Sequence, residues 1–177
     1  MLHNRRDVIT AECLKNLYFL LIYSRLQYGV LVYGFATATT LKPLFTCCNK
    51  VLRTVQFQNR YSNVKQMYLK YNTFSVFQLH KLHIGKLVFK CFNSDSPVPD
   101  IIRNLFFQPN AIRSNNYDTR LSNTRYLYYN SEPGFFSSYA YLCYKEWNSI
   151  PTDIRMANSF NHFTKLFRQQ LFETWYD

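Results

Sequence analysis

The sequence of 177 residues is poor in glycine and proline, with 4 Gly and 6 Pro. Such low numbers exclude a collagen-like chain and a flexible low-complexity linker. Hydrophobic residues make up 47% of the chain and charged residues 18%, a balance that excludes wholesale disorder and allows a sizeable core. The length suits one compact domain, or two small domains that share an interface.

Long hydrophobic runs are also missing. The apolar run Leu17–Tyr23 covers seven residues, far fewer than the ~20 that a membrane-spanning helix needs. Continuing it forward meets Arg25, Gln27 and Gly29. The run therefore predicts a buried core helix, and neither a signal peptide nor a membrane segment is expected.

Metal-binding cysteine pairs are absent, because the five cysteines are irregularly spaced and form no CxxC. This argues against a zinc ribbon, and an odd number argues against a secreted disulfide framework. His80 and His83 are close enough to reach one metal ion, but no further ligands follow at a suitable spacing, so structural histidines are favoured. The sequence predicts an intracellular chain with free thiols and no metal or cofactor.

Catalytic signatures are missing as well. The sequence has no GxxxxGK or GxGxxG phosphate loop, no HExxH and no GxSxG. Its six aspartates are scattered, and no two are adjacent. Two-metal nucleotidyl transfer needs carboxylates that converge on metal ions ~3.5–4 Å apart. The chain alone is therefore not expected to be an enzyme.

Acidic residues are absent from Cys13 to Ser94, a stretch that contains eleven basic residues. The rest of the chain has ten basic and ten acidic residues, so the whole net charge of +11 comes from this stretch. A long acid-free segment repels itself unless counter-charge arrives from a partner, and phosphate is the commonest source. This distribution favours a nucleic-acid ligand; the alternative is a solvated basic surface without a specific ligand.

Aromatic residues are abundant, with 16 Phe and 15 Tyr. Asparagine is also common, while alanine and glycine are scarce, which is the bias that AT-rich codons produce. Base composition of the gene explains such numbers. The aromatic count alone therefore does not predict a surface for base stacking.

The hydrophobic pattern predicts a mainly α fold: a helical thumb-like bundle, then a smaller, more irregular helical region with a long loop. Helices are expected at 11–28, 41–55, 74–92, 101–106, 135–147 and 160–171, with N-caps at Thr40, Asp100 and Ser159. A short β-branched segment follows Gly29 at 30–33, and residues 108–134 are expected to form the loop. The Ser- and Pro-rich segment 94–99 marks a boundary between domains at 1–94 and 95–177.

The predicted helix 41–55 has one apolar face and one basic face. At ~100° per residue, Lys42, Lys50 and Arg53 fall within an arc of about 80°. Pro43 is expected in the first turn, where a missing N–H costs little. Such a stripe of cations suits a nucleic-acid backbone, although an ordinary amphipathic helix with a solvent-exposed face has the same pattern.

Several segments, taken in order, resemble the carboxy-terminal thumb and post-thumb region of non-LTR (LINE, jockey-like) retrotransposon reverse transcriptases. LYFLLIYSRLQYG at 17–29 is similar to the family's "LY-x-SLIYS-x-L-x-YG" stretch, and CNKVLRTV at 48–55 to its "QNKVLRTI". GKLVFK at 85–90 resembles "GKFMYK", YDTR at 117–120 resembles "Y-x-TR", and KEWNSIP at 145–151 resembles "K-x-WNSLP". Cys48 and Cys143 depart from the family, which usually has Gln and Gly there.

The resemblance implies reverse transcription in the parent protein, primed at a nicked DNA target. It also implies that the fingers, the palm and the endonuclease domain lie upstream of Met1, and the paired aspartates of the palm are absent here. The function implied for this chain is to hold an RNA template or RNA–DNA hybrid by its backbone. The residues predicted to do so are Arg25, Lys42, Lys50, Arg53 and Arg60.

Two interpretations stay open at this point. Either the chain contacts nucleic acid, or it is an inactive structural remnant whose apolar face has lost its palm partner and promotes self-association. Trp147 and Pro151 are assigned to packing.

Overall fold

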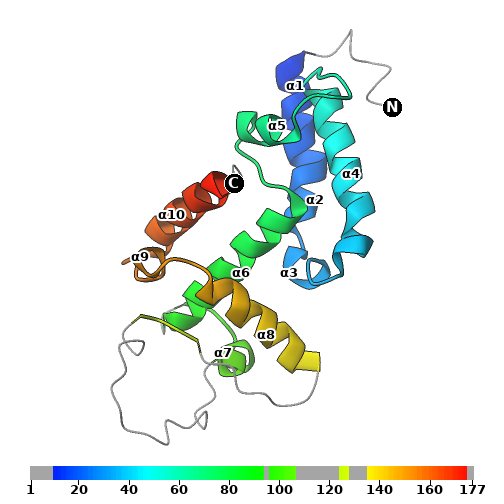
Figure 1. The fold of residues 1–177 in the computed structure, drawn as a ribbon. Coiled ribbons are helices and arrows are strands. Elements are labelled where there is room, and N and C mark those ends of the chain that lie inside the picture. The colour runs from blue at the N-terminus through cyan, green and yellow to red at the C-terminus, as the bar shows by residue number, and fades with distance from the viewer. Residues whose placement is uncertain (1–9, 94–95, 107–123, 128–134, 175–177) are drawn as a thin grey trace, which may run out of the picture. The chain divides into compact units, whose positions relative to one another are not determined.

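The computed structural model describes residues 10–93, 96–106, 124–127 and 135–174 (Figure 1). This part of the chain is built from helices and contains no β-strand, which confirms the predicted mainly α fold. Most of the predicted loop at 108–134 lies outside the described residues, as does the YDTR segment at 117–120.

The chain divides into two compact units, Met1–His80 and Lys81–Asp177, called unit 1 and unit 2 below. The sequence predicted a boundary at 94–95 instead, and those two residues lie outside the described part. The division falls inside a helix, because α6 contributes its first residues to the core of unit 1 and the remainder to that of unit 2.

Unit 1 begins with one continuous helical run. Its parts are α1 (Ala11–Leu17), the π-helix η2 (Tyr18–Tyr23) and α2 (Ser24–Gln27). The Thr10 side chain caps the start by accepting a hydrogen bond from the Cys13 N–H at 3.3 Å. Gly29 ends the run with a φ of 69°, a left-handed conformation that suits glycine. The predicted helix 11–28 is therefore present, with a π-helical middle that the periodicity did not reveal.

The next element had no structure assigned to it from the sequence, and the one after it corrects the prediction. The β-branched segment at 30–33 is a single helical turn, α3 (Val30–Tyr33), and the following helix α4 (Ala38–Val55) starts three residues before the predicted start. Thr37, and not Thr40, is the N-cap, since its side-chain oxygen accepts from the Thr40 N–H at 3.4 Å. Pro43 consequently lies beyond the first turn, where it cannot donate to the Thr39 carbonyl.

A short helix that the sequence analysis missed, α5 (Val64–Lys70), follows α4 and packs against it. Asn63 caps α5 through the Lys65 N–H at 2.9 Å. Two buried hydrogen bonds fasten α5 to α4: Tyr68 donates to the Asn49 side chain at 3.0 Å, and the Gln56 side chain donates to the Met67 carbonyl at 2.7 Å. Because part of the contact between α5 and α4 is polar, α5 lacks the regular apolar spacing by which a helix is recognised in a sequence.

The core of unit 1 lies between the helical run, α4, α5 and the start of α6 (Val76–Phe92). The largest buried side chains of this core are Leu14, Tyr18, Leu52, Tyr68, Phe74 and Leu79. Aromatic contacts join the first helical run to the segment after α5, where the Tyr18 and Tyr71 rings lie 6.1 Å apart.

The described residues of unit 2 form the rest of α6 and four further helices. These are α7 (Asp100–Phe106), α8 (Phe135–Asn148), α9 (Thr152–Arg155) and α10 (Phe160–Glu173). The helices predicted at 101–106, 135–147 and 160–171 are confirmed, although Asp100, the predicted cap, is the first residue of α7. Ser159 caps α10 by accepting from the His162 N–H at 3.2 Å. The one-turn helix α9 was missed, being too short for a periodic pattern.

Helices α6 and α10 approach closely at Gly85. A Cβ atom at this position would lie 2.5 Å from the Phe167 ring, so a larger residue would push the helices apart. Beside this contact, the Phe89 and Phe163 rings stack with centroids 4.5 Å apart, and Trp147 lies 5.8 Å from Phe163. The core of unit 2 is thus an aromatic cluster around a glycine.

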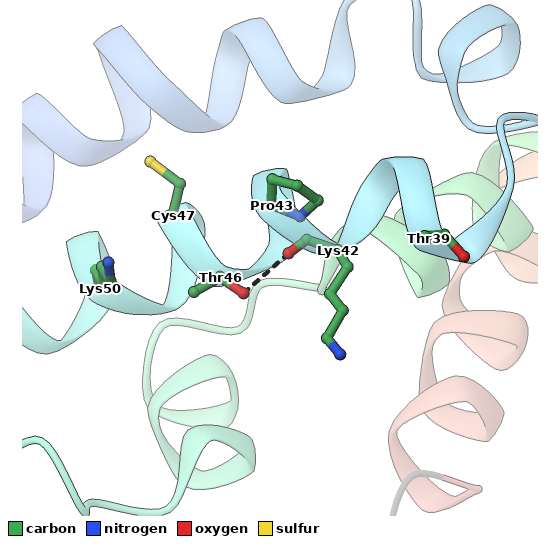
Figure 2. A pocket seen from close by; sticks show the side chains of 6 residues that line it. All are labelled: Thr39, Lys42, Pro43, Thr46, Cys47 and Lys50. Atoms are coloured by element: carbon green, nitrogen blue, oxygen red, sulfur yellow. Dashed lines mark hydrogen bonds between the residues drawn. The ribbon is translucent and has the colours of Figure 1, made fainter.

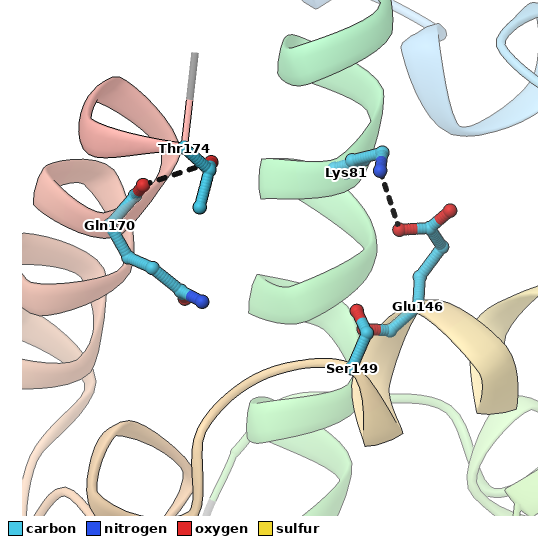
Figure 3. Close-up of polar contacts among 5 residues, drawn as sticks. All are labelled: Lys81, Glu146, Ser149, Gln170 and Thr174. Atoms are coloured by element: carbon cyan, nitrogen blue, oxygen red, sulfur yellow. Dashed lines mark hydrogen bonds and ion pairs between the residues drawn. The ribbon is translucent and has the colours of Figure 1, made fainter. Parts of the chain in front are cut away.

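The link between α6 and α8 includes one ion pair, between Lys81 and Glu146 at 3.3 Å (Figure 3). Figure 3 also shows the end of α10, where Thr174 donates to the Gln170 carbonyl at 3.0 Å. Both interactions are near solvent, so they add little to the stability that the aromatic core provides.

Candidate nucleic-acid interface

The candidate interface centres on the solvent-facing side of α4. This helix buries Leu41, Cys48, Leu52 and Val55, which fixes its orientation against α1, η2 and α5. The opposite side remains exposed along the first three turns. Packing on one side therefore determines which side chains α4 presents to a ligand.

A shallow hollow of about 480 Å³ runs along this exposed side (Figure 2). It is lined by Thr39, Lys42, Pro43, Thr46, Cys47 and Lys50. Thr46 donates to the Lys42 carbonyl at 2.9 Å, so its hydroxyl proton is engaged within the helix. The two ammonium groups are accordingly the main charged groups that this hollow offers to a ligand.

Lys42 and Lys50 are the two predicted site residues that the structure brings together. Both are exposed and both line the hollow. Lys50 follows Lys42 by eight positions of α-helix, which corresponds to about 12 Å along the helix axis. This spacing allows the two ammonium groups to meet phosphates several nucleotides apart on one strand.

Arg53 lies on the same predicted stripe but has a different environment. It is half-buried, and its Nε atom is enclosed without a hydrogen-bond partner. The reason is α5, which covers the last turns of α4 and places Tyr68 against Asn49, one turn before Arg53. Burial raises the pKa of Tyr68, and the nearby Arg53 charge opposes that rise. Arg53 is thus less available to a ligand than the helical wheel indicated.

Arg25 and Arg60 lie on other elements of unit 1. Arg25 is exposed on α2, and Arg60 is exposed in the turn between α4 and α5, where its N–H bonds the Asn59 side chain at 2.6 Å. Neither residue lines the hollow. The structure thus gathers two of the five predicted residues around one hollow and leaves the other three beside it or elsewhere on unit 1.

The surroundings of these cations contain little negative charge. Among the described residues of unit 1, Glu12 is the single carboxylate side chain, and it lies in the first turn of α1. The described residues of this unit include eight lysines and arginines. Eight of the eleven cations of the acid-free stretch 13–94 therefore lie in one compact unit.

The thiols next to the hollow have unequal environments. Cys47 is exposed and lines the hollow, whereas Cys48 is buried on the core side of α4, where burial raises its pKa to about 11. Cys48 is therefore a packing residue. All five cysteines are free thiols.

The two histidines considered as metal ligands are packing residues. The His80 ring lies edge-on to Phe35 at 4.5 Å, and burial with the nearby Lys86 charge lowers the pKa of His83 to about 4. Across the described ranges, no three His, Cys, Asp or Glu side chains gather in a way that could hold a metal ion.

Trp147 and Asn148 attach a distant segment to α8, whereas the sequence analysis assigned only packing to Trp147. Trp147 is buried and donates to the Arg125 carbonyl at 2.7 Å. The Asn148 side chain both accepts from the Leu127 N–H at 3.1 Å and donates to the Leu127 carbonyl at 2.9 Å. The WN pair thus fastens residues 124–127 to the end of α8, a structural role that no local pattern reveals.

Arg125 completes this attachment. Its guanidinium donates to the carbonyls of Arg155 and Ala157 at 2.9 and 3.3 Å and lies 5.1 Å from the centre of the Phe89 ring. It neutralises the carbonyl end of the short helix α9. This arginine is therefore a structural cation of unit 2, although its residue type alone would suit a phosphate.

Comparisons with protein-family models, with curated proteins and with solved structures found no match. Among the helices that the structure describes, none combines the length and the apolar character required to cross a bilayer.

Proposed function

We propose that this chain is a non-catalytic, nucleic-acid-contacting module that holds an RNA template or RNA–DNA hybrid by its backbone. The segment-by-segment resemblance suggests that it derives from the thumb and post-thumb region of a non-LTR retrotransposon reverse transcriptase. Its role there would be to grip the duplex while a separate palm domain performs RNA-directed DNA synthesis. An intracellular location belongs to the same proposal and agrees with the free thiols.

The observation that carries this proposal is the pair Lys42 and Lys50 on an exposed hollow within an acid-free stretch. From Cys13 to Ser94 no carboxylate side chain competes with a phosphate for these cations. Lysine binds phosphate as a flexible point charge, which suits contacts that position a strand without reading its sequence. Each neutralised phosphate also releases counterions, so binding becomes stronger at low salt.

Catalysis is assigned to other domains because this sequence contains no adjacent aspartates. A polymerase site needs carboxylates that converge on two metal ions. The chain is therefore proposed to have no nucleotidyl-transfer activity by itself. A primer-extension assay that yields product with this chain alone would contradict that assignment.

The proposal is tested by fluorescence anisotropy with a labelled RNA hairpin and an RNA–DNA hybrid, titrated between about 50 and about 300 mM salt. We expect a Kd on the order of micromolar with a steep salt dependence and no preference for sequence. The double variant Lys42→Ala/Lys50→Ala should reduce the slope of log K against log salt by roughly 1.5, because each phosphate contact contributes about 0.7 to 0.9.

The matched control is the double variant Lys145→Ala/Lys165→Ala, which removes the same charge from exposed positions of unit 2. It should leave the slope within about 0.5 of the original value. If both double variants reduce the slope equally, the cations act as a diffuse cloud and the hollow has no special role. Binding that does not respond to salt would discard the proposal.

A second candidate is the inactive structural remnant. It is favoured by Leu20, Leu21 and Val32, which expose large apolar side chains on unit 1. Such a surface predicts self-association in the absence of a partner. Sedimentation velocity over a range of concentrations distinguishes the two, since a monodisperse monomer that binds RNA supports the nucleic-acid module and an oligomer without RNA binding supports the remnant.

A further inference from the structure

Two tyrosines of unit 1 project into solvent almost completely. Tyr28 is 87% exposed and Tyr61 is 89% exposed. The other described tyrosines of this unit are buried or half-buried: Tyr18, Tyr23, Tyr33, Tyr68 and Tyr71. The gene's codon bias accounts for how many tyrosines the chain contains, but it does not account for two that remain outside the core.

Each exposed tyrosine has an exposed arginine close to it in the chain. Arg25 precedes Tyr28 by three residues at the end of α2, and Arg60 directly precedes Tyr61 in the turn after α4. Surfaces that hold a single strand combine these two residue types, because the aromatic ring stacks on a base while the cation meets the neighbouring phosphate.

The two Arg–Tyr pairs belong to segments at opposite ends of α4 (Figure 1). The α2–α3 turn lies toward the start of α4, and the 56–63 turn follows directly from its end. The 18 residues of α4 span about 27 Å, the length of roughly eight stacked nucleotides at about 3.4 Å each. Between these ends, Lys42 and Lys50 line the hollow.

The positive charge of unit 1 indicates which kind of ligand the rings of Tyr28 and Tyr61 contact. A second copy of this chain would bring another acid-poor, cationic surface against the first and would be repelled. A nucleic acid supplies both the negative charge and the aromatic faces. Bases inside a duplex are stacked on one another, so a stacking tyrosine requires unpaired bases.

We infer that Tyr28 and Tyr61 stack on unpaired bases, so that unit 1 binds a single-stranded segment in preference to a fully paired duplex. The inference rests on the proposed function, since it specifies the ligand of the same unit. Lys42 and Lys50 would hold the backbone between the two stacked positions.

The test compares a single-stranded RNA of about 12 nucleotides, long enough to span both positions, with a blunt RNA–DNA hybrid of the same sequence. The variants are Tyr28→Ala/Tyr61→Ala and Tyr28→Phe/Tyr61→Phe, with Tyr141→Ala as a control at an exposed tyrosine of unit 2. Thermal melts verify folding, which these exposed positions should not disturb.

The alanine variant should weaken single-strand binding by about tenfold or more, because each ring that stacks on a base contributes a sequence-tolerant part of the affinity. Its salt slope should stay unchanged, since no charge is lost. The phenylalanine variant keeps the ring face and should bind like the parent chain, and Tyr141→Ala should have no effect.

Unchanged single-strand affinity in the alanine variant overturns the inference. If Lys42→Ala/Lys50→Ala still reduces the salt slope in that case, the proposed backbone-binding function stands without stacking. If the parent chain binds neither ligand, the proposed function itself fails. The inference is also overturned if the alanine variant loses equal affinity for the single strand and the hybrid. It is overturned as well if this variant stops self-associating but binds RNA as the parent chain does.

Discussion

The basic residues of unit 1 and unit 2 have different surroundings. In unit 1, exposed cations such as Lys42 and Lys50 lie in a stretch without acidic neighbours. In unit 2, two cations have partners within the unit: Lys81 pairs with Glu146 near the surface, and Arg125 bonds two backbone carbonyls and lies over an aromatic ring. The difference teaches that a basic residue indicates a ligand only where no group of the protein itself binds its charge.

The comparison predicts that unit 2 variants alter stability and that unit 1 variants alter binding. The largest effect should come from Trp147→Ala, which removes a fully buried ring and its hydrogen bond to Arg125. The free energy of unfolding should fall by about 3–5 kcal/mol. Urea denaturation measures this loss, and an effect below about 1 kcal/mol would show that the aromatic cluster does not hold unit 2 together.

A pH effect of the next size should arise from His83. Its pKa is about 4 in the folded chain and about 6.5 when unfolded, so the unfolded state binds more protons between these values. Stability should therefore fall as pH decreases from 6.5 toward 4, by less than about 3 kcal/mol, since solvent screens the charge of this half-buried ring. His83→Leu should flatten this dependence, whereas His162→Gln, at an exposed position, should keep it.

Removing the Asn148 side chain should have an intermediate effect. Asn148→Ala leaves the Leu127 N–H and carbonyl without their partners, at a cost of about 1–3 kcal/mol. Hydrogen exchange should show faster exchange at the Leu127 amide than in the parent chain. An unchanged rate at this amide would mean that the side-chain bonds do not protect it.

The ion pair of unit 2 should contribute little. Glu146→Gln removes the partner of Lys81, whose side chain is 48% exposed, and should cost less than about 1 kcal/mol. The loss should shrink in high salt. A larger, salt-independent loss would indicate that Glu146 has a packing role that the pair does not explain.

The smallest change in stability is expected in unit 1. Lys42→Ala/Lys50→Ala alters exposed side chains within a like-charged region, so the free energy of unfolding should change by less than about 0.5 kcal/mol. Because the same variant should weaken the salt dependence of RNA binding, it separates the two units functionally. A marked loss of stability would erase the contrast between them.

Sequence reasoning succeeded where the information was local. The α10 helix, with Ser159 as its cap and Phe163 and Phe167 on its buried side, follows from spacing alone. It failed for α5, whose attachment to α4 uses the buried polar pair Asn49 and Tyr68. Missing α5 also affected the predicted site, because α5 covers the part of the basic face that contains Arg53.

Tertiary contacts also explain the remaining differences. Thr37 and Thr40 are both suitable N-caps by type, and the choice between them is made by the position of the preceding turn α3. Asn148 bonds a segment more than twenty positions earlier in the chain, so no window of sequence connects the two. The exposure of Tyr28 and Tyr61 likewise depends on which faces the other helices leave uncovered.

The π-helix η2 sets the rotational phase of the helical run that contains it. Its wider turns accommodate an additional residue, and with it Tyr18, Tyr23 and Leu26 are all buried. Deleting one residue from this stretch would restore an ordinary α-helix and keep Leu26 on the core side, whereas adding one would turn the following helix by about 100° and carry Leu26 away from the core. Unit 1 should consequently tolerate substitutions at the exposed Leu20 far better than the insertion of a residue between Tyr18 and Tyr23.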